Sequence, residues 1–321
     1  QVIRRARRKN PEATLIVTGC AAQLAPERYG AMPEVDRVIG NKEKLHLATY
    51  AKRSFEEQPV LVSDIMAERK VTPHFIAEGR SRAFVQIQQG CDHRCTFCII
   101  PFARGPNRSV GMGHLVRQVS NLVEQGSKEV ILTGVDICSY GHESQGRLGL
   151  GDMVAKLLDA VPGLARLRLS SLDPAAMDDT LFRLIADEPR LMPHLHLSLQ
   201  AMDDMVLKRM KRRHTRRVGF SVVERIRAAR PDVAIGADLI AGFPTETDKM
   251  FFNTFDAVRS LQLTHLHVFP YSVREGTPAA KMPNVPSDII KSRAATLRDA
   301  GDQEFVKLRM NQVGSVRHTG G

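Results

Sequence analysis

Short apolar runs alternate with longer amphipathic stretches between Ala83 and Phe269. The apolar runs have the length of buried strands and lie at 83–87, 129–132, 167–170, 194–199, 234–240 and 265–269. Helical spacing of apolar residues marks the stretches 115–124, 153–160, 180–186, 218–229 and 250–261, and a long basic helix is predicted at 287–310. Strands that alternate with helices pair in parallel through right-handed crossovers. Six such units are fewer than the eight of a closed barrel, so the pattern predicts an α/β fold with an open (β/α)6 partial barrel.

The N-terminal part of the chain follows a shorter pattern. Residues 1–10 have the composition of the end of a basic helix, and the apolar runs 13–17 and 35–39 suit short buried parallel strands. Asn41 is placed to cap a helix that follows it. The polar segment 69–82 contains proline and glycine, which predicts a linker between two domains.

The amino-acid composition indicates which kinds of binding partner the chain suits. The 321 residues are 43% hydrophobic and 25% charged, as in an ordinary soluble protein, and no apolar run approaches the roughly 20 residues of a membrane span. Lysine and arginine outnumber the acids by 46 to 35, which gives a net charge of +11. That excess suits a polyanion such as RNA, although an inert basic surface would show it too. With no tryptophan and 5% aromatic residues, a base-stacking platform for single strands is not expected.

Three cysteines in one short loop are the strongest chemical signal. Cys91, Cys95 and Cys98 form the pattern CxxxCxxC. Thiolates are soft ligands that hold iron–sulfur clusters, and a four-iron cluster with three thiolates keeps one iron open. S-adenosylmethionine (SAM) can chelate that iron, and its reductive cleavage gives a 5′-deoxyadenosyl radical. The loop therefore predicts a SAM-binding [4Fe–4S] cluster with these cysteines as its catalytic ligands.

Two other interpretations of the cysteines are weaker. A zinc site usually has CxxC pairs that lie further apart, with a fourth Cys or His nearby, and His93 is poorly placed inside the loop for that role. A disulfide framework needs a denser cysteine set than 5 in 321 residues, and no signal peptide is visible.

The loop and its flanks resemble the radical-SAM methylthiotransferases, most closely the branch that acts on N6-threonylcarbamoyladenosine in tRNA. The matching segments are 88–109, 17–23, 132–137, 169–174, 197–200, 208–214, 236–247, 269–272 and 274–278. The cysteine loop alone would indicate only the superfamily. The ordered set is specific to the methylthiotransferases.

The resemblance implies a domain organisation. Residues 1–75 match the later part of a flavodoxin-like domain that holds an auxiliary [4Fe–4S] cluster, and Cys20 matches the last of its three cysteine ligands. The radical-SAM core would occupy 76–311. Residues 312–321 resemble the start of a small RNA-binding barrel called TRAM. The chain is therefore expected to be a fragment of a longer protein, cut at both ends, that lacks the other auxiliary ligands.

The resemblance also implies residues that bind SAM. They are Phe97 at the adenine, and Gly134 and Asp136 at the amino group of the methionine moiety. Ser171 and Gln200 could bind the ribose hydroxyls or the methionine carboxylate, and Arg213 could pair with that carboxylate. Each has a structural alternative: a hydrophobic plug, a strand-to-helix turn, a helix cap or a solvated charge. Cys138 follows the second strand motif and is interpreted as an incidental thiol.

The basic run 208–217 follows the fourth predicted strand, at the end of the barrel where the site should form. It holds seven Lys or Arg residues and His214. These side chains could contact tRNA phosphates, or they could form a solvated face.

Together these features predict a cytoplasmic tRNA methylthiotransferase. It would take a hydrogen from C2 of N6-threonylcarbamoyladenosine next to the anticodon, and then deliver sulfur and a methyl group from a second SAM. Alternative substrates are isopentenyladenosine in tRNA or an aspartate of a ribosomal protein, and an alternative of another class is a non-catalytic Fe–S or RNA-binding fragment. The implied partners are the tRNA anticodon stem-loop and an electron donor such as flavodoxin or ferredoxin, with a monomeric chain and no membrane.

Overall fold

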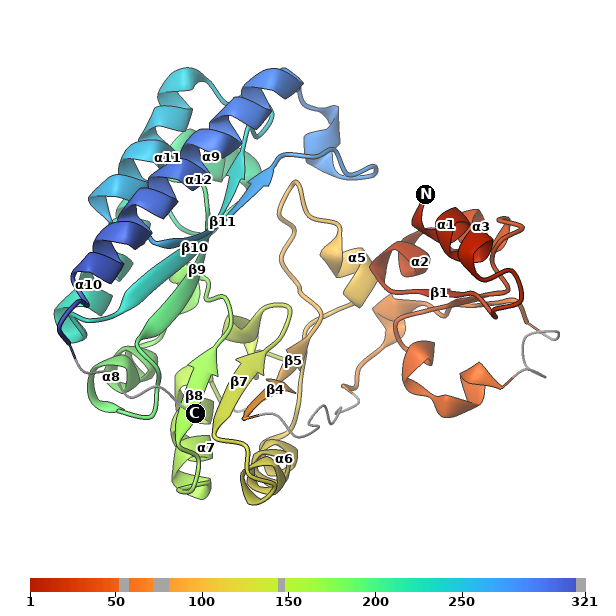
Figure 1. The fold of residues 1–321 in the computed structure, drawn as a ribbon, viewed down its shortest axis with the longest axis horizontal. Coiled ribbons are helices and arrows are strands. Elements are labelled where there is room, and N and C mark those ends of the chain that lie inside the picture. The colour runs from red at the N-terminus through yellow and green to blue at the C-terminus, as the bar shows by residue number, and fades with distance from the viewer. Residues whose placement is uncertain (52–57, 72–80, 144–147, 316–321) are drawn as a thin grey trace. The chain divides into compact units, whose positions relative to one another are not determined.

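The computed structural model describes residues 1–51, 58–71, 81–143 and 148–315, and these divide into two compact units (Figure 1). The first unit comprises Gln1–Thr72 with 90–93 and 99–106, and the second comprises the rest. The predicted linker 69–82 falls mostly on residues 72–80, which lie outside the described residues. None of the described helices is both long and apolar enough to cross a membrane.

The first unit is a small parallel α/β structure. Its strands pair in the order β1-β2-β3, with bounds Ile16–Thr18, Arg37–Ile39 and Val60–Leu61. Its α-helices are α1 (Val2–Lys9), α2 (Cys20–Leu24), α3 (Pro26–Gly30) and α5 (Ile100–Arg104), and its 3-10 helices are η1 (Glu43–Leu45), η2 (Leu47–Tyr50) and η3 (Ile65–Ala67). The central strand β2 is fully buried, as its apolar run predicted. The strand β3 is too short to show in the hydrophobic pattern.

The capping role predicted for Asn41 is wrong. The segment after it begins as the 3-10 helix η1, whose N-cap is Lys42 and has no side-chain hydrogen bond. The Asn41 amide instead donates to the carbonyl of Ala103 (2.8 Å), and its oxygen accepts from Lys44 (2.8 Å). The side chain is therefore engaged by α5, a contact between positions 62 residues apart that local sequence cannot reveal.

The second unit contains the predicted open barrel. Three parallel strands, β4 (Arg82–Gln86), β7 (Glu129–Thr133) and β8 (Arg166–Leu169), form one half of the sheet. The parallel strands β9 (His194–Gln200), β10 (Ala234–Ala241) and β11 (His265–Pro270) form the other half. Isolated bridges Leu167↔Leu191 and Leu172↔Leu197 connect the halves. All six predicted strands are confirmed to within one residue at each end.

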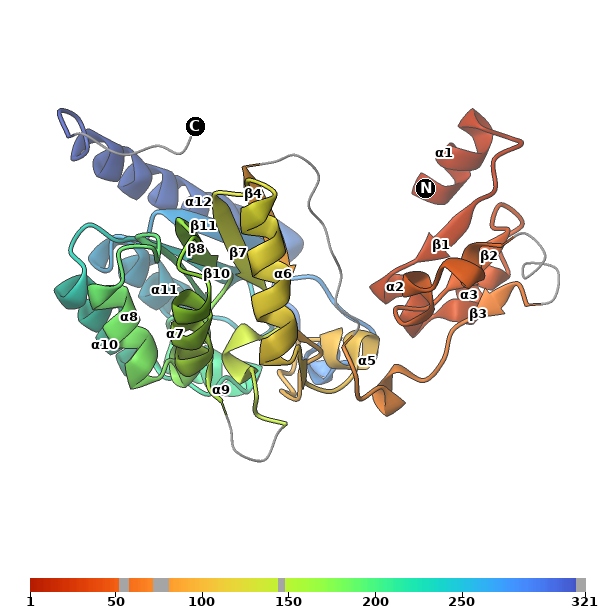
Figure 2. The ribbon, with the colours of Figure 1, turned by 90° about the horizontal axis from the view of Figure 1, so that it is seen from below.

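Helices cover one face of this sheet (Figures 1 and 2). They are α6 (Met112–Glu124), α7 (Leu150–Ala160), α8 (Asp179–Asp187), α9 (Asp204–Met210), α10 (Arg216–Ala229), α11 (Asp248–Ser260) and α12 (Ser287–Met310), with 3-10 turns η4 (Ile137–Ser139), η5 (Pro174–Ala176) and η6 (Pro278–Lys281). The pattern missed α9 and the short antiparallel pair β5 (Gln88–Gln89) and β6 (Arg108–Ser109). Alternate strand residues such as Leu195, Leu197 and Leu239 are fully buried against the helices, so the intervening residues form the opposite, inner face.

A half-buried histidine on this inner face, His194, makes folding sensitive to acid. Burial, followed by the charges of His265, Arg168 and His196, lowers the pKa of His194 to about 4 from 6.5. The unfolded chain therefore binds more protons than the folded chain between these values, and stability is lost as pH falls from 6.5 towards 4.

We expect His194→Gln, which cannot be protonated, to flatten this decline. The wild-type free energy of unfolding should fall by an amount on the order of 2 kcal/mol across the window, and the variant should lose much less. His214, whose pKa burial also lowers to about 4, should keep part of the slope. Urea unfolding at several pH values measures the free energy of unfolding of both proteins. Parallel plots of this free energy against pH would contradict the expectation.

Candidate radical SAM site

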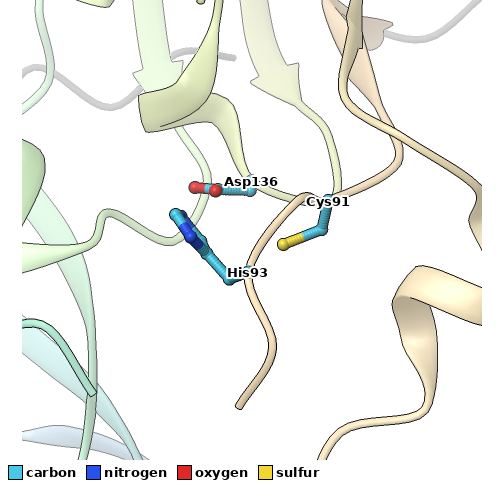
Figure 3. A group of neighbouring side chains, drawn as sticks. All are labelled: Cys91, His93 and Asp136. Carbon is cyan, nitrogen blue, oxygen red and sulfur yellow. The ribbon is translucent and has the colours of Figure 1, made fainter. Parts of the chain in front are cut away.

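The loop between β5 and α5 carries the three cysteines, and it contributes Gly90–His93 to the first unit and Arg94–Cys98 to the second. Gly90 has a φ of 75°, and a Cβ there would overlap the carbonyl of Pro106, so the loop requires glycine at this point. The N–H of Cys91 donates to the carbonyl of Gly105 (3.1 Å). Figure 3 shows Cys91 and His93 on this part of the loop.

The second part of the loop is anchored through Thr96. Its N–H donates to the carbonyl of Met210 (3.0 Å), and its hydroxyl donates to that of Arg209 (2.7 Å). Its own carbonyl accepts from the N–H of Ala279 (2.9 Å). These bonds fix the backbone next to Cys95, and fixed backbone positions help a loop to hold its ligands in place.

Phe97 packs against a buried apolar cluster. Its ring meets Phe243 edge to face at 6.4 Å and 83°, within a cluster that also contains Tyr271. The neighbouring Cys98 donates its N–H to the carbonyl of Cys95 (3.1 Å), which closes a tight turn. The Phe97 ring therefore contributes to apolar packing in this unit, and adenine contact stays a prediction.

A buried glutamine organises the loop after β7. The Gln88 side-chain oxygen accepts from the N–H groups of Val135 (2.9 Å) and Asp136 (2.8 Å), and its amide donates to Asn107 (2.6 Å). A Cβ at Gly134 would come within 2.8 Å of the same oxygen, so the glycine permits this close approach. The sequence pattern identified Gly134 and Asp136 but missed Gln88, because only the fold brings β5 beside this loop.

Asp173, which follows β8, pairs with two arginines in the turn between α9 and α10. Its carboxylate lies 3.3 Å from Arg212 and 3.1 Å from Arg213, and it caps η5 by accepting from the N–H of Ala175. Burial raises the pKa of Asp173, but the two arginines and the capping bond outweigh burial and lower it overall. Arg212 also donates to the carbonyl of Ser198 (2.7 Å) and lies 3.9 Å from the Cys95 sulfur. The sequence prediction named Arg213 but missed Arg212, which is the more buried of the two.

Two other predicted SAM-binding residues lie at strand ends of the same unit. The Ser171 hydroxyl donates to Asp238 (3.3 Å). Gln200 ends β9 with a φ of 64°, a left-handed conformation that is uncommon for a residue with a side chain. Backbone strain of this kind is frequent at binding sites.

The predicted basic run 208–217 is not one helix. It covers the end of α9, a turn with Lys211 in the left-handed conformation, and the start of α10. Arg209 donates to the carbonyl of Thr245, and Arg216 pairs with Asp256 (2.8 Å), so part of the run serves the fold. Its exposed cations are Lys208, Lys211, Arg213 and Arg217.

Cys20 begins α2 in the first unit. Its sulfur accepts from the Nε–H of Arg104 (3.0 Å) and lies 4.0 Å from the amide nitrogen of Asn41. Donors of this kind suit a thiolate. Cys138, in contrast, is buried, and burial raises the pKa of its thiol to about 12, which agrees with an incidental thiol.

Comparison with known proteins identifies the class. The family model of the radical SAM superfamily matches residues 85–258. The structure resembles a radical SAM methyltransferase from Kitasatospora setae, TsrM, solved with tryptophan and a SAM analogue, with a TM-score of 0.64 at 17% identity, over 87% of this chain and 59% of that one. The fold and the cysteine loop are therefore those of a radical SAM enzyme, with SAM and a [4Fe–4S] cluster as its cofactors.

Two curated relatives identify the family within the radical SAM superfamily. A threonylcarbamoyladenosine tRNA methylthiotransferase of Rickettsia prowazekii is 50% identical over 98% of this chain and 74% of its own length. A tRNA-2-methylthio-N6-dimethylallyladenosine synthase of Cereibacter sphaeroides is 35% identical over 95% of this chain and 70% of its own length. The chain belongs to the methylthiotransferase family of radical SAM enzymes.

Proposed function

We propose that the enzyme methylthiolates C2 of N6-threonylcarbamoyladenosine next to the anticodon of tRNA. The observation that carries this choice is the 50% identity to the Rickettsia relative named for that nucleoside, against 35% for the relative named for dimethylallyladenosine. The +11 charge agrees with an RNA substrate.

Cys91, Cys95 and Cys98 are the proposed ligands of the SAM-binding cluster. The bound cluster and SAM supply radical chemistry that no side chain provides. The chain's residues would hold and orient the cofactors. Thr96 fixes the ligand loop through its three hydrogen bonds. Gly134, Asp136, Ser171 and Gln200 at strand ends, together with Arg213 before α10, would bind SAM, with Phe97 against its adenine.

We further propose a second, auxiliary [4Fe–4S] cluster with Cys20 as one ligand. The hydrogen bond from Arg104 to the Cys20 sulfur supports this proposal, because hydrogen bonds to the ligating sulfurs are a feature of iron–sulfur sites. SAM cleavage needs a reductant, for which we propose flavodoxin or ferredoxin acting on a monomeric enzyme in the cytoplasm.

A product assay tests which modified nucleoside is the substrate. The protein is reconstituted anaerobically with iron and sulfide, then given SAM, a reductant and tRNAs that carry either threonylcarbamoyladenosine or dimethylallyladenosine. Mass spectrometry of the digested tRNA should find the 2-methylthio product only from the first tRNA. A product only from the second would overturn the proposed substrate.

We propose that exposed cations of the 208–217 run contact tRNA phosphates. Making Lys208, Lys211 and Arg217 alanine should weaken tRNA binding and reduce the log–log salt slope by roughly 0.7–0.9 per lost contact, because each contact releases counterions. These three are chosen because Arg212 and Arg216 also support the fold. Affinity measured at several salt concentrations gives the slope. A matched variant with Lys128, Lys156 and Arg183 made alanine should keep the salt slope of the parent protein. Equal slopes in both variants would show that the 208–217 run is a solvated face and does not contact tRNA.

A further inference from the structure

A polar cluster of His196, Asp238 and His267 lies on the inner face of the barrel sheet, beside the Ser171 hydroxyl that was proposed for SAM. Strands β9 and β11 both begin with His-Leu-His, and β10 runs between them. The leucines between the histidines point towards the helices, which leaves His196 and His267 on the inner face with Asp238 of β10. Three neighbouring strands therefore present one acid and two imidazoles to the same space.

Hydrogen bonds fix the geometry of this cluster. Asp238 Oδ1 lies 3.0 Å from His196 Nε2 and 3.1 Å from His267 Nδ1, and Oδ2 accepts from the Ser171 hydroxyl (3.3 Å). The two imidazole rings are 4.5 Å apart at 34°. Because Nδ1 of His267 faces the carboxylate, its Nε2 points away from it.

The three members differ in exposure. The side chain of His267 is 65% exposed, whereas that of His196 is 9% exposed and that of Asp238 is 17% exposed. His267 lies on β11, an end strand of the described sheet, and Phe269 lies two residues further on with 52% exposure. Their rings meet edge to face at 6.5 Å. An exposed aromatic ring beside a fixed hydrogen-bonding ring is the kind of surface on which proteins hold an unstacked base.

The charges on the inner face indicate which kind of ligand this surface favours. On the other half of the sheet Arg82, Arg166 and Arg168 surround the buried Glu129 at 2.7–3.2 Å. Among the described inner-face residues of the six strands, three arginines thus face two acids, Glu129 and Asp238, with the histidines adding charge when protonated. Such a surface favours an anionic group over an uncharged apolar one.

We propose that His267, held by Asp238, binds the carboxylate of the threonylcarbamoyl group. The inference rests on the proposed substrate. A dimethylallyl group has no atom that can accept a hydrogen bond, whereas the threonylcarbamoyl group ends in a carboxylate, which accepts from the Nε2–H of a histidine ring when both ring nitrogens carry protons. Asp238 is a positioning residue in this arrangement, because its contact with Nδ1 orients the ring.

Binding of three anticodon stem-loop RNAs tests the proposal, with SAM present and reductant absent so that nothing turns over. The RNAs carry threonylcarbamoyladenosine, its analogue with the carboxylate converted to a primary amide, or dimethylallyladenosine. The wild-type protein should bind the carboxylate RNA about ten- to a hundredfold more tightly than the amide RNA, the range of a charged hydrogen bond. In His267→Phe that ratio should fall to about one.

Two further variants separate a recognition role from a structural one. His114→Phe, a matched change at an exposed histidine on α6, should keep the wild-type ratio. Asp238→Asn should lower the ratio in the wild-type background and leave it unchanged in the His267→Phe background, because Asp238 acts through the ring. A fold-wide effect would lower affinity for all three RNAs equally.

The outcomes distinguish the two proposals. A wild-type protein that prefers the carboxylate RNA, combined with a His267→Phe variant that keeps this preference, would overturn the role of His267 alone. A wild-type protein that prefers the dimethylallyl RNA would overturn both the proposed substrate and this inference.

Discussion

Replacing any one of Cys91, Cys95 and Cys98 with alanine is expected to abolish the formation of 5′-deoxyadenosine from SAM. A cluster held by two thiolates loses the site-differentiated iron that SAM requires, and such clusters are unstable. The measurement is 5′-deoxyadenosine after reduction with dithionite, together with iron content per chain. We expect a loss to the background rate for each single variant, and a triple variant without the SAM-binding cluster.

Cys138→Ala is the matched control for this series. That thiol is buried, its pKa is raised to about 12, and its sulfur accepts from the N–H of Asp173 (3.3 Å), so it is a protonated structural group. The variant should keep SAM cleavage. If the triple alanine variant still held about four irons per chain and cleaved SAM, the ligand assignment would be wrong.

Replacing Arg212 with leucine is expected to cost about 3 kcal/mol of unfolding free energy. The change removes the more buried of the two arginines that pair with Asp173, whose carboxylate is 7% exposed. It also removes the hydrogen bond from Arg212 to the carbonyl of Ser198. A buried charge that loses its partner destabilises a protein strongly. Arg213→Leu is the control, because that side chain is 38% exposed and should cost less than half as much.

Denaturant unfolding of the cluster-free protein measures both variants. Working without the cluster separates the ion pair from any effect on cofactor binding. Equal stabilities of Arg212→Leu and the parent protein would show that Arg212 does not support the fold through Asp173. Its proximity to the Cys95 sulfur, at 3.9 Å, would then be the remaining reason for its position.

The first unit shows where sequence reasoning reaches its limit. The run 35–39 predicted a buried strand at β2, which is confirmed although the strand begins two residues later, and the buried Arg37 within it could not be expected from its polarity. The start predicted for β1 is three residues early, and β3 was not predicted, since strands of two or three residues carry little periodicity. The error at Asn41 has the same origin as the bond from Arg104 to Cys20: both are contacts with α5, which lies far along the chain.

By itself the sequence determined the repeating strand–helix units, the ligand loop and the basic charge of this enzyme. The strands and the proposed cluster ligands can be predicted from neighbouring residues, because alternate burial marks a strand and cysteine spacing marks a ligand loop. Only the tertiary structure decided which polar groups meet. Gln88 reaches the loop after β7, Arg212 joins Asp173, and His196, Asp238 and His267 gather from three strands, because parallel pairing fixes a register that no local pattern contains.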